Sequence, residues 1–156
     1  MKKSYFLYAP LTIGIFIWGI LVAGGDLRWF FDLPSVILIL CPLLFLLLAI
    51  FGPGSIVDAF RAAMGSGEAT KYELQRAILF FATAQKVFIL AGVLATLAGI
   101  FMTLYGISRS DTGYPYLVYL VVAFLTVFYS IFLMMVVTVP FKAALENKLY
   151  KLEEGE

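Results

Sequence analysis

Long uncharged apolar stretches dominate the pattern of polar and apolar residues along this chain. They lie at about Tyr5–Gly24, Ser35–Phe51, Val87–Ile107 and Pro115–Val139, and none contains Asp, Glu, Lys or Arg. Each is close to the roughly 20 residues that a helix needs to cross about 30 Å of hydrocarbon. The pattern therefore predicts an all-α membrane protein with four transmembrane helices, forming a single domain over residues 1–156.

The segment 52–86 between the second and third stretches carries its own helical pattern. Gly52-Pro53-Gly54 is a strong breaker and ends the second span. Apolar residues then recur at helical spacing from Ile56 to Met64, with Asp58 and Arg61 on the other side. This spacing predicts a short amphipathic helix at the membrane surface, within a short cytoplasmic segment.

The third and fourth helices are predicted to be longer than a membrane is thick. Thr70-Lys71-Tyr72-Glu73 is a capping-box pattern for a helix start, and no proline follows it before Ile107. Such a helix would be about 55 Å long, well beyond the bilayer. The fourth stretch likewise continues past Pro140 into a helix-compatible segment, 142–152. We therefore expect these two helices to extend together into the cytoplasm.

The basic residues predict which side of the membrane each loop faces. Nine of the eleven lie in the N-terminal tail, the segment 52–86 and the C-terminal tail, whereas the other two loops hold only Arg28 and Arg109. The positive-inside rule assigns the basic side to the cytoplasm. Both termini are therefore predicted to be cytoplasmic.

The composition limits the kinds of site and partner that this chain can have. The chain is 63% hydrophobic and only 13% charged, which is too few polar residues to cover a soluble core of this size. Cys41 is the single cysteine and histidine is absent, which excludes an intrachain disulfide, a zinc site built on Cys and His, and a Cys/His nucleophile. The net charge of +1 gives no reason to expect nucleic acid. We predict a protein that is not an enzyme and needs no cofactor.

The third span carries small residues on one face, at Gly92, Ala95, Ala98 and Gly99. Small residues allow helices to approach closely in lipid. One interpretation is tight packing of spans within one subunit, and the other is a face that lines a central bore around a partner helix.

Two hydroxyls, Thr96 and Thr126, lie within apolar spans. A membrane threonine usually donates to a carbonyl of its own helix. A hydroxyl can also orient water or solvate a partner carboxylate without carrying charge. Tyr129 follows Thr126 by three residues and either shares its face or anchors at the interface. Asp32 is placed to stabilise the start of the second helix, or alternatively to attract cations on the outer side.

Three ordered segments resemble the MotA/TolQ/ExbB proton-channel family. Residues 29–40 (WFFDLPSVILIL) resemble the start of the second span of flagellar stator A subunits, and residues 92–100 (GVLATLAGI) resemble the third span. Residues 126–130 (TVFYS), with Pro140 and Leu145 downstream, are similar to the fourth span. The chain departs from the family at Ala95 and Ser130, where glycine is usual, and at Val127, where a second threonine is common. It also lacks the large cytoplasmic domain that contacts the flagellar rotor.

The resemblance implies an A-type subunit of a motor driven by the proton motive force, in the bacterial inner membrane. Such a subunit forms a homo-oligomer, a pentamer by resemblance, around a dimer of single-span B-type subunits of the MotB, ExbD or TolR kind. The spans here hold no ionisable carboxylate or amine, so the partner would supply the proton-binding Asp. The implied ion-pathway residues are Thr96, Thr126 and Tyr129. The implied subunit or partner packing residues are Gly92, Ala95, Gly99, Ser130 and Pro140.

Two other functions stay open from the residues alone. The chain is alternatively a four-helix membrane scaffold or assembly protein without ion flux. A small solute exporter is the weakest alternative, because such exporters generally place an ionisable residue within a span.

Overall fold

The computed structural model describes residues 5–65, 69–108 and 116–154, and within them every regular element is helical. This confirms the predicted all-α class. The elements, in chain order, are α1 (Tyr5–Val22), the 3₁₀ turn η1 (Leu27–Phe30), α2 (Leu33–Phe51), α3 (Ser55–Met64), α4 (Lys71–Ser108), α5 (Tyr116–Leu133), a π-helical turn (Met134–Thr138) and α6 (Val139–Glu154).

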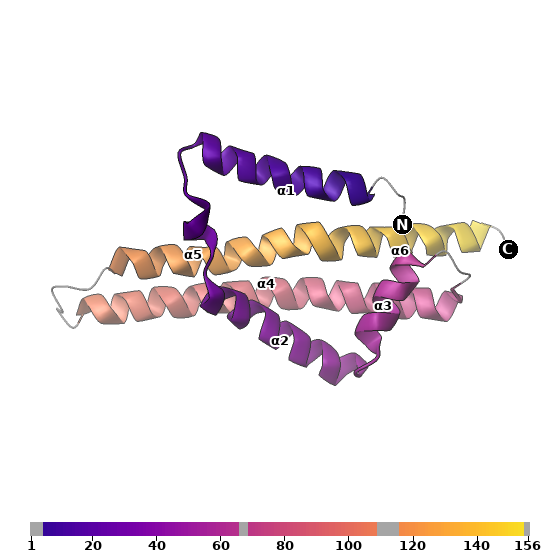
Figure 1. The fold of residues 1–156 in the computed structure, drawn as a ribbon. Helices are drawn as coiled ribbons and strands as arrows, with labels where there is room; N and C mark the ends of the chain where they lie inside the picture. Colours follow the sequence, from indigo (N-terminus) through magenta and orange to yellow (C-terminus); the bar gives the residue numbers. More distant parts are fainter. Residues whose placement is uncertain (1–4, 66–68, 109–115, 155–156) are drawn as a thin grey trace.

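Two long antiparallel helices form the frame of the molecule. α4 has 38 residues without a break, which is about 57 Å of helix, as the sequence predicted. α5, the π turn and α6 run back along it as one continuous rod that passes Pro140, which confirms the predicted continuation (Figure 1). α2 and α3 pack against one flank of this pair, and α1 lies apart on the other side of α5 in the view of Figure 1.

The start of α4 has the predicted capping box. The Thr70 backbone N–H donates to the Glu73 carboxylate at 2.9 Å, and the Glu73 N–H donates back to the Thr70 hydroxyl at 3.3 Å. These bonds occupy N–H groups that the first turn leaves without helical partners. The hydrogen bond from the Thr70 backbone N–H holds the pKa of Glu73 below its ordinary value, and the hydrogen bond from the Thr70 hydroxyl contributes to a lesser extent.

The ends of α2 also follow from its sequence. The Asp32 carboxylate caps the helix by accepting from the Ser35 N–H at 2.9 Å and from the Ser35 hydroxyl, and Pro34 lies in the first turn. This confirms the capping interpretation of Asp32. Gly52 ends the helix with a φ of 88°, a conformation that side chains other than glycine rarely adopt.

A wide turn precedes Pro140 in the second long helix. Across Met134–Thr138 the backbone is π-helical, and the Val139 N–H donates to the Met134 carbonyl, five residues earlier. Proline lacks an N–H and its ring clashes with the carbonyl four residues before it in a regular helix. The widened turn lets the chain continue as helix on both sides of the proline.

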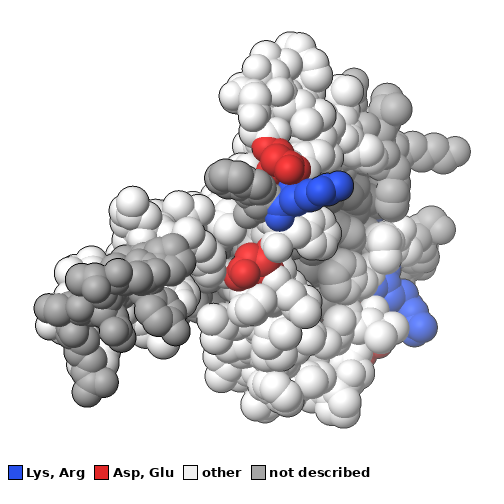
Figure 2. Space-filling model, turned by 60° about the vertical axis from the view of Figure 1, so that its left-hand side comes forward, with Lys and Arg blue, Asp and Glu red and all other residues white. Residues whose placement is uncertain are grey.

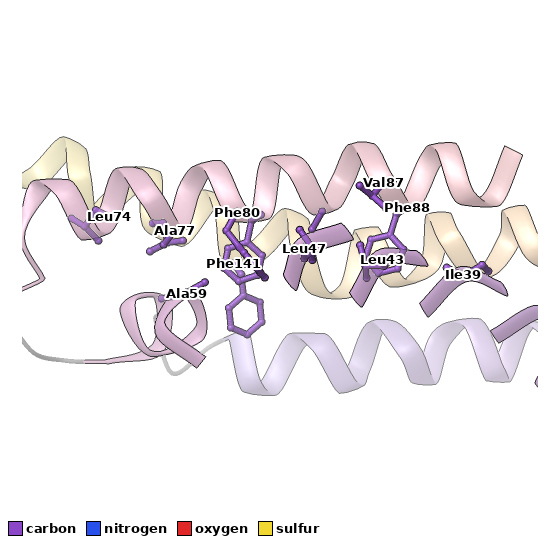
Figure 3. Packing of buried hydrophobic residues seen from close by; sticks show 14 residues of the cluster. Ile39, Leu43, Leu47, Ala59, Leu74, Ala77, Phe80, Val87, Phe88 and Phe141 are labelled. Carbon is purple, nitrogen blue, oxygen red and sulfur yellow. The ribbon is translucent and has the colours of Figure 1, made fainter. Parts of the chain in front are cut away.

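The hydrophobic core lies along the buried faces of α2 and α3. Ile39, Leu43 and Leu47 recur every four residues on the buried face of α2 and pack towards α4 (Figure 3). Nearby, the rings of Phe81 and Phe141 stack with centroids 5.6 Å apart. The core therefore joins α2, α3, α4 and α6.

α3 confirms the predicted short helix and is fixed to α6 by a lysine. Its buried residues include Ala59 and Ala63. The Lys148 ammonium donates to the carbonyls of Ala62 and Gly65, each at 2.7 Å. A cation at this end also complements the negative end of the helix dipole. Burial lowers the pKa of the Lys148 amine from its usual value, because desolvation penalises the charged form.

We expect Lys148→Met to weaken the attachment of α3 to α6. Methionine keeps the apolar stem, whereas two carbonyls lose a charged donor, at a cost of about 1–3 kcal/mol. Hydrogen exchange of the α3 amides should accelerate. Lys151→Met is the matched control, because Lys151 is exposed on the same helix. Equal exchange rates in the two variants would show that the lysine does not hold α3.

Among the described residues, three helices are long and apolar enough to cross a membrane: Leu33–Phe51, Lys71–Ser108 and Leu117–Glu154. They identify a membrane-embedded protein. In α1 the apolar segment Ala9–Val22 is shorter than these three helices. Its packing includes an edge-to-face contact between Phe16 and Phe132 at 5.7 Å, and most of its large side chains are exposed.

Candidate functional site: a hydroxyl seam between α4 and α5

α4 and α5 approach most closely along a series of small and hydroxyl residues. Gly92 faces Ser130, Thr96 faces Thr126, and Gly99 faces Ala123, as expected for two antiparallel helices in a constant register. A Cβ placed on Gly99 would lie 2.6 Å from the Cβ of Ala123, closer than real Cβ contacts. The two backbones are therefore held at a separation that only glycine permits. We call this set of six residues the seam.

The two threonines meet at the centre of the seam. Their hydroxyl oxygens are 2.8 Å apart, although 30 residues separate them in the chain. Thr96 also lies 2.8 Å from the Gly92 carbonyl and 2.9 Å from the Ala123 carbonyl. Thr126 lies 2.7 Å from the Ala123 carbonyl. Each threonine thus has a carbonyl of its own helix within hydrogen-bond distance, as is usual for a membrane threonine, and the contact between the two hydroxyls bridges the helices.

Counting protons shows what this pair can do. Two hydroxyls supply two protons, so if one hydroxyl donates to the other, only one proton is left for the carbonyls of Gly92 and Ala123. Exchanging the donor and acceptor roles moves hydrogen bonds without creating a charge. The two hydroxyls can therefore exchange hydrogen-bond roles within an apolar interface, but neither can take up an additional proton and hold its charge.

Ser130 adds a third hydroxyl to the seam. Its side chain is 1% exposed, and its oxygen has no hydrogen-bond partner among the described residues. Sequence reasoning assigned Ser130 only to packing. Its position four residues after Thr126 places it on the same helix face, and this spacing was the available indication of a shared role.

Tyr129 lies elsewhere. Its phenol oxygen accepts the backbone N–H of Asp32 at 3.2 Å, at the start of α2. Phe128, the residue before it, packs edge-to-face on Phe30 of η1 at 5.7 Å. The structure therefore brings Thr96 and Thr126 together and directs Tyr129 towards the α1–α2 connection.

The hydrogen bond between Asp32 and Tyr129 fixes the position of α2 along the axes of the two long helices. Tyr129 is about 20 Å along α5 from its first residue, since each residue adds 1.5 Å. The C-terminal end of α4 and the N-terminal end of α5 therefore extend well beyond the start of α2 (Figure 1). The connection bearing Asp26, Arg28 and Asp32 lies beside the middle of the fourth apolar stretch, a level that the apolar pattern did not predict. In Figure 2 most of the visible face is uncharged; acidic and basic side chains lie close together near its centre, and a further basic group lies at its right-hand edge.

A groove of about 450 Å³ opens beside the seam. The start of α2 forms one wall with Ser35 and Leu38, and the C-terminal part of α4 and the N-terminal part of α5 form the others. Ala95, Gly99 and Thr126 line it, so the predicted small face is partly open, although Thr126 itself is 2% exposed. Pro140 is far along the chain from this groove and belongs to the π-turn region.

The seam offers no metal site. Within the described residues, no three His, Cys, Asp or Glu side chains come together in a way that suits a metal ion. Comparison with known proteins adds no assignment, since no family model matches the chain and no curated protein gives a significant match.

Proposed function

We propose that this chain is the A-type subunit of a membrane motor driven by the proton motive force, of the MotA/TolQ/ExbB kind. One observation carries the proposal. The two threonines that the resemblance places in the ion pathway come from different spans and lie in hydrogen-bonding contact, 2.8 Å apart. A groove lined by Thr126 lies beside them. A partner carboxylate that entered this groove would lie beside the threonine pair, and a neutral hydroxyl can donate or accept once it exchanges its present partner.

The proposal includes an arrangement in the membrane. The chain has four spans, with both termini in the cytoplasm of a bacterium. The N-terminal part of α4 and the C-terminal part of α6 project on that side. Five copies form a ring around a dimer of single-span B-type subunits. The partner supplies the Asp that binds and releases protons, and this chain supplies the seam and the surrounding wall.

Proton flux in vesicles tests the proposal. Vesicles containing this chain alone should hold a pH gradient, because each seam group is neutral. Adding a partner with one span and a membrane Asp should dissipate the gradient, whereas the same partner with Asp→Asn should not. Robust flux through the chain alone, or equal flux with both partners, would contradict the proposed division of roles.

A scaffold without ion flux is the second candidate, and one observation favours it. Each threonine hydroxyl lies within hydrogen-bond distance of a carbonyl of its own helix, and such a bond is enough to explain both residues as packing residues. In that case no partner would change the proton permeability of the vesicles.

A further inference from the structure

A second pocket, of about 540 Å³, lies between α3 and the N-terminal part of α4, away from the seam. Its lining changes character from one side to the other. Phe51 and Phe80 supply an apolar part, with ring centroids 5.4 Å apart. Charged side chains supply the rest: Asp58, Arg61, Glu73 and Arg76. Such a lining suits a ligand that has both an apolar and a charged portion.

The pocket lies where a boundary between lipid and water is expected. Phe51 is the last residue of α2, which is long and apolar enough to cross a membrane. The Arg76 guanidinium donates to the Phe51 carbonyl at 3.1 Å, so a charged group meets the end of this span directly. The exposed apolar residues Val57 and Met64 on α3 are also suited to an interface. Headgroups of membrane lipids occupy this level.

The pocket is lined by two acidic and two basic side chains, and these differ in how far they are already engaged. Glu73 is engaged by both the N–H and the hydroxyl of Thr70. Arg76 is held by the Phe51 carbonyl through one nitrogen, which leaves its other N–H groups for a ligand. Arg61 and Asp58 lie on the exposed side of α3. The pocket thus offers two guanidinium groups for a phosphate and a carboxylate for an ammonium group.

We propose that this pocket binds the headgroup of an aminophospholipid, a phosphodiester joined to a primary ammonium. The two arginines bind the phosphate, Asp58 accepts hydrogen bonds from the ammonium, and the acyl chains leave past Phe51 and Phe80. A headgroup that is only anionic offers Asp58 no cationic partner. A quaternary ammonium has no N–H to donate to it.

Thermal stability of the full-length, delipidated chain in a non-ionic detergent tests this assignment. Phosphatidylethanolamine should raise the unfolding midpoint more than phosphatidylcholine or phosphatidylglycerol with the same acyl chains. Inorganic phosphate should give no shift. Equal shifts from all three lipids, a larger shift from phosphatidylglycerol, or a shift from phosphate alone would overturn the proposal.

Variants locate the binding in this pocket. Arg61→Gln should weaken apparent binding of phosphatidylethanolamine about tenfold, because a charged hydrogen bond is lost. Asp58→Asn should remove the preference over phosphatidylcholine while leaving binding. Lys151→Gln is the control, because Lys151 lies outside the pocket lining. Unchanged affinity in Arg61→Gln together with unchanged lipid preference in Asp58→Asn would overturn the site, even if the chain binds lipid elsewhere.

Discussion

Gly92→Ala is expected to force α4 and α5 apart and to lower the stability of the helix pair by about 1–3 kcal/mol. A Cβ at position 92 would lie 2.7 Å from the Cβ of Ser130 and closer still to its hydroxyl oxygen. Ser130 is 1% exposed, so it has no space into which to move. The midpoint of thermal unfolding, followed by size-exclusion chromatography, measures the effect.

A compensating change separates this effect from a general intolerance of alanine. In Gly92→Ala with Ser130→Gly, the two clashing atoms are gone and the next neighbour is the Thr126 carbonyl at 3.5 Å, an ordinary contact. Stability should return towards that of the parent chain. Gly19→Ala in α1 is the matched control, because nothing lies within 4 Å of its added Cβ. A stable Gly92→Ala variant would show that the helices are not as close as described.

The double variant Thr96→Val with Thr126→Val is expected to lower partner-dependent proton flux at least tenfold while preserving assembly. Valine keeps the shape of threonine, and the lost helix-to-helix hydrogen bond is worth only about 0.6 kcal/mol in a membrane. The effect on a partner carboxylate is larger. Losing one hydrogen bond to a charged group costs about 1.5–3 kcal/mol, or roughly ten- to hundredfold in an equilibrium constant.

The single variants carry further information. In either one, the remaining hydroxyl still has a carbonyl within reach, because each threonine lies within 3 Å of the Ala123 carbonyl. Flux should therefore fall less in each single variant than in the double one. Thr103→Val is the control, because Thr103 donates to the Gly99 carbonyl of its own helix, outside the threonine pair. Ring formation and flux are measured on the same preparations, and full flux in the double variant would contradict a channel role for both hydroxyls.

Local features of the fold could be predicted because their causes are local. The start of α4 was predictable because Thr70 and Glu73 satisfy each other within one turn. The limits of α2 were predictable for the same reason, since Asp32 caps its start and Gly52 ends it. A shared role for Thr96 and Thr126 was expected only through the resemblance, since the residues themselves favoured a simple bond within each helix. Their direct contact was not predicted.

Features that depend on how helices slide past one another could not be predicted. A regular apolar helix repeats its buried face with every turn, so its periodicity does not fix its level along a neighbour. The bond from Asp32 to Tyr129 joins residues 97 apart and depends on that level. The two bonds from Lys148 to the end of α3 are similar, because a flexible side chain reaches carbonyls more than 80 residues away in sequence.

The π turn gives the two long helices different mechanical properties. α4 has an uninterrupted ladder of backbone hydrogen bonds over 38 residues and acts as a stiff rod. In the neighbouring rod, the widened turn at Met134–Thr138 and the missing N–H of Pro140 fall together, and such sites are where helices bend. Flexing of the pair is therefore expected to concentrate at this joint in one rod, while the other transmits displacement along its length to the level of the threonines.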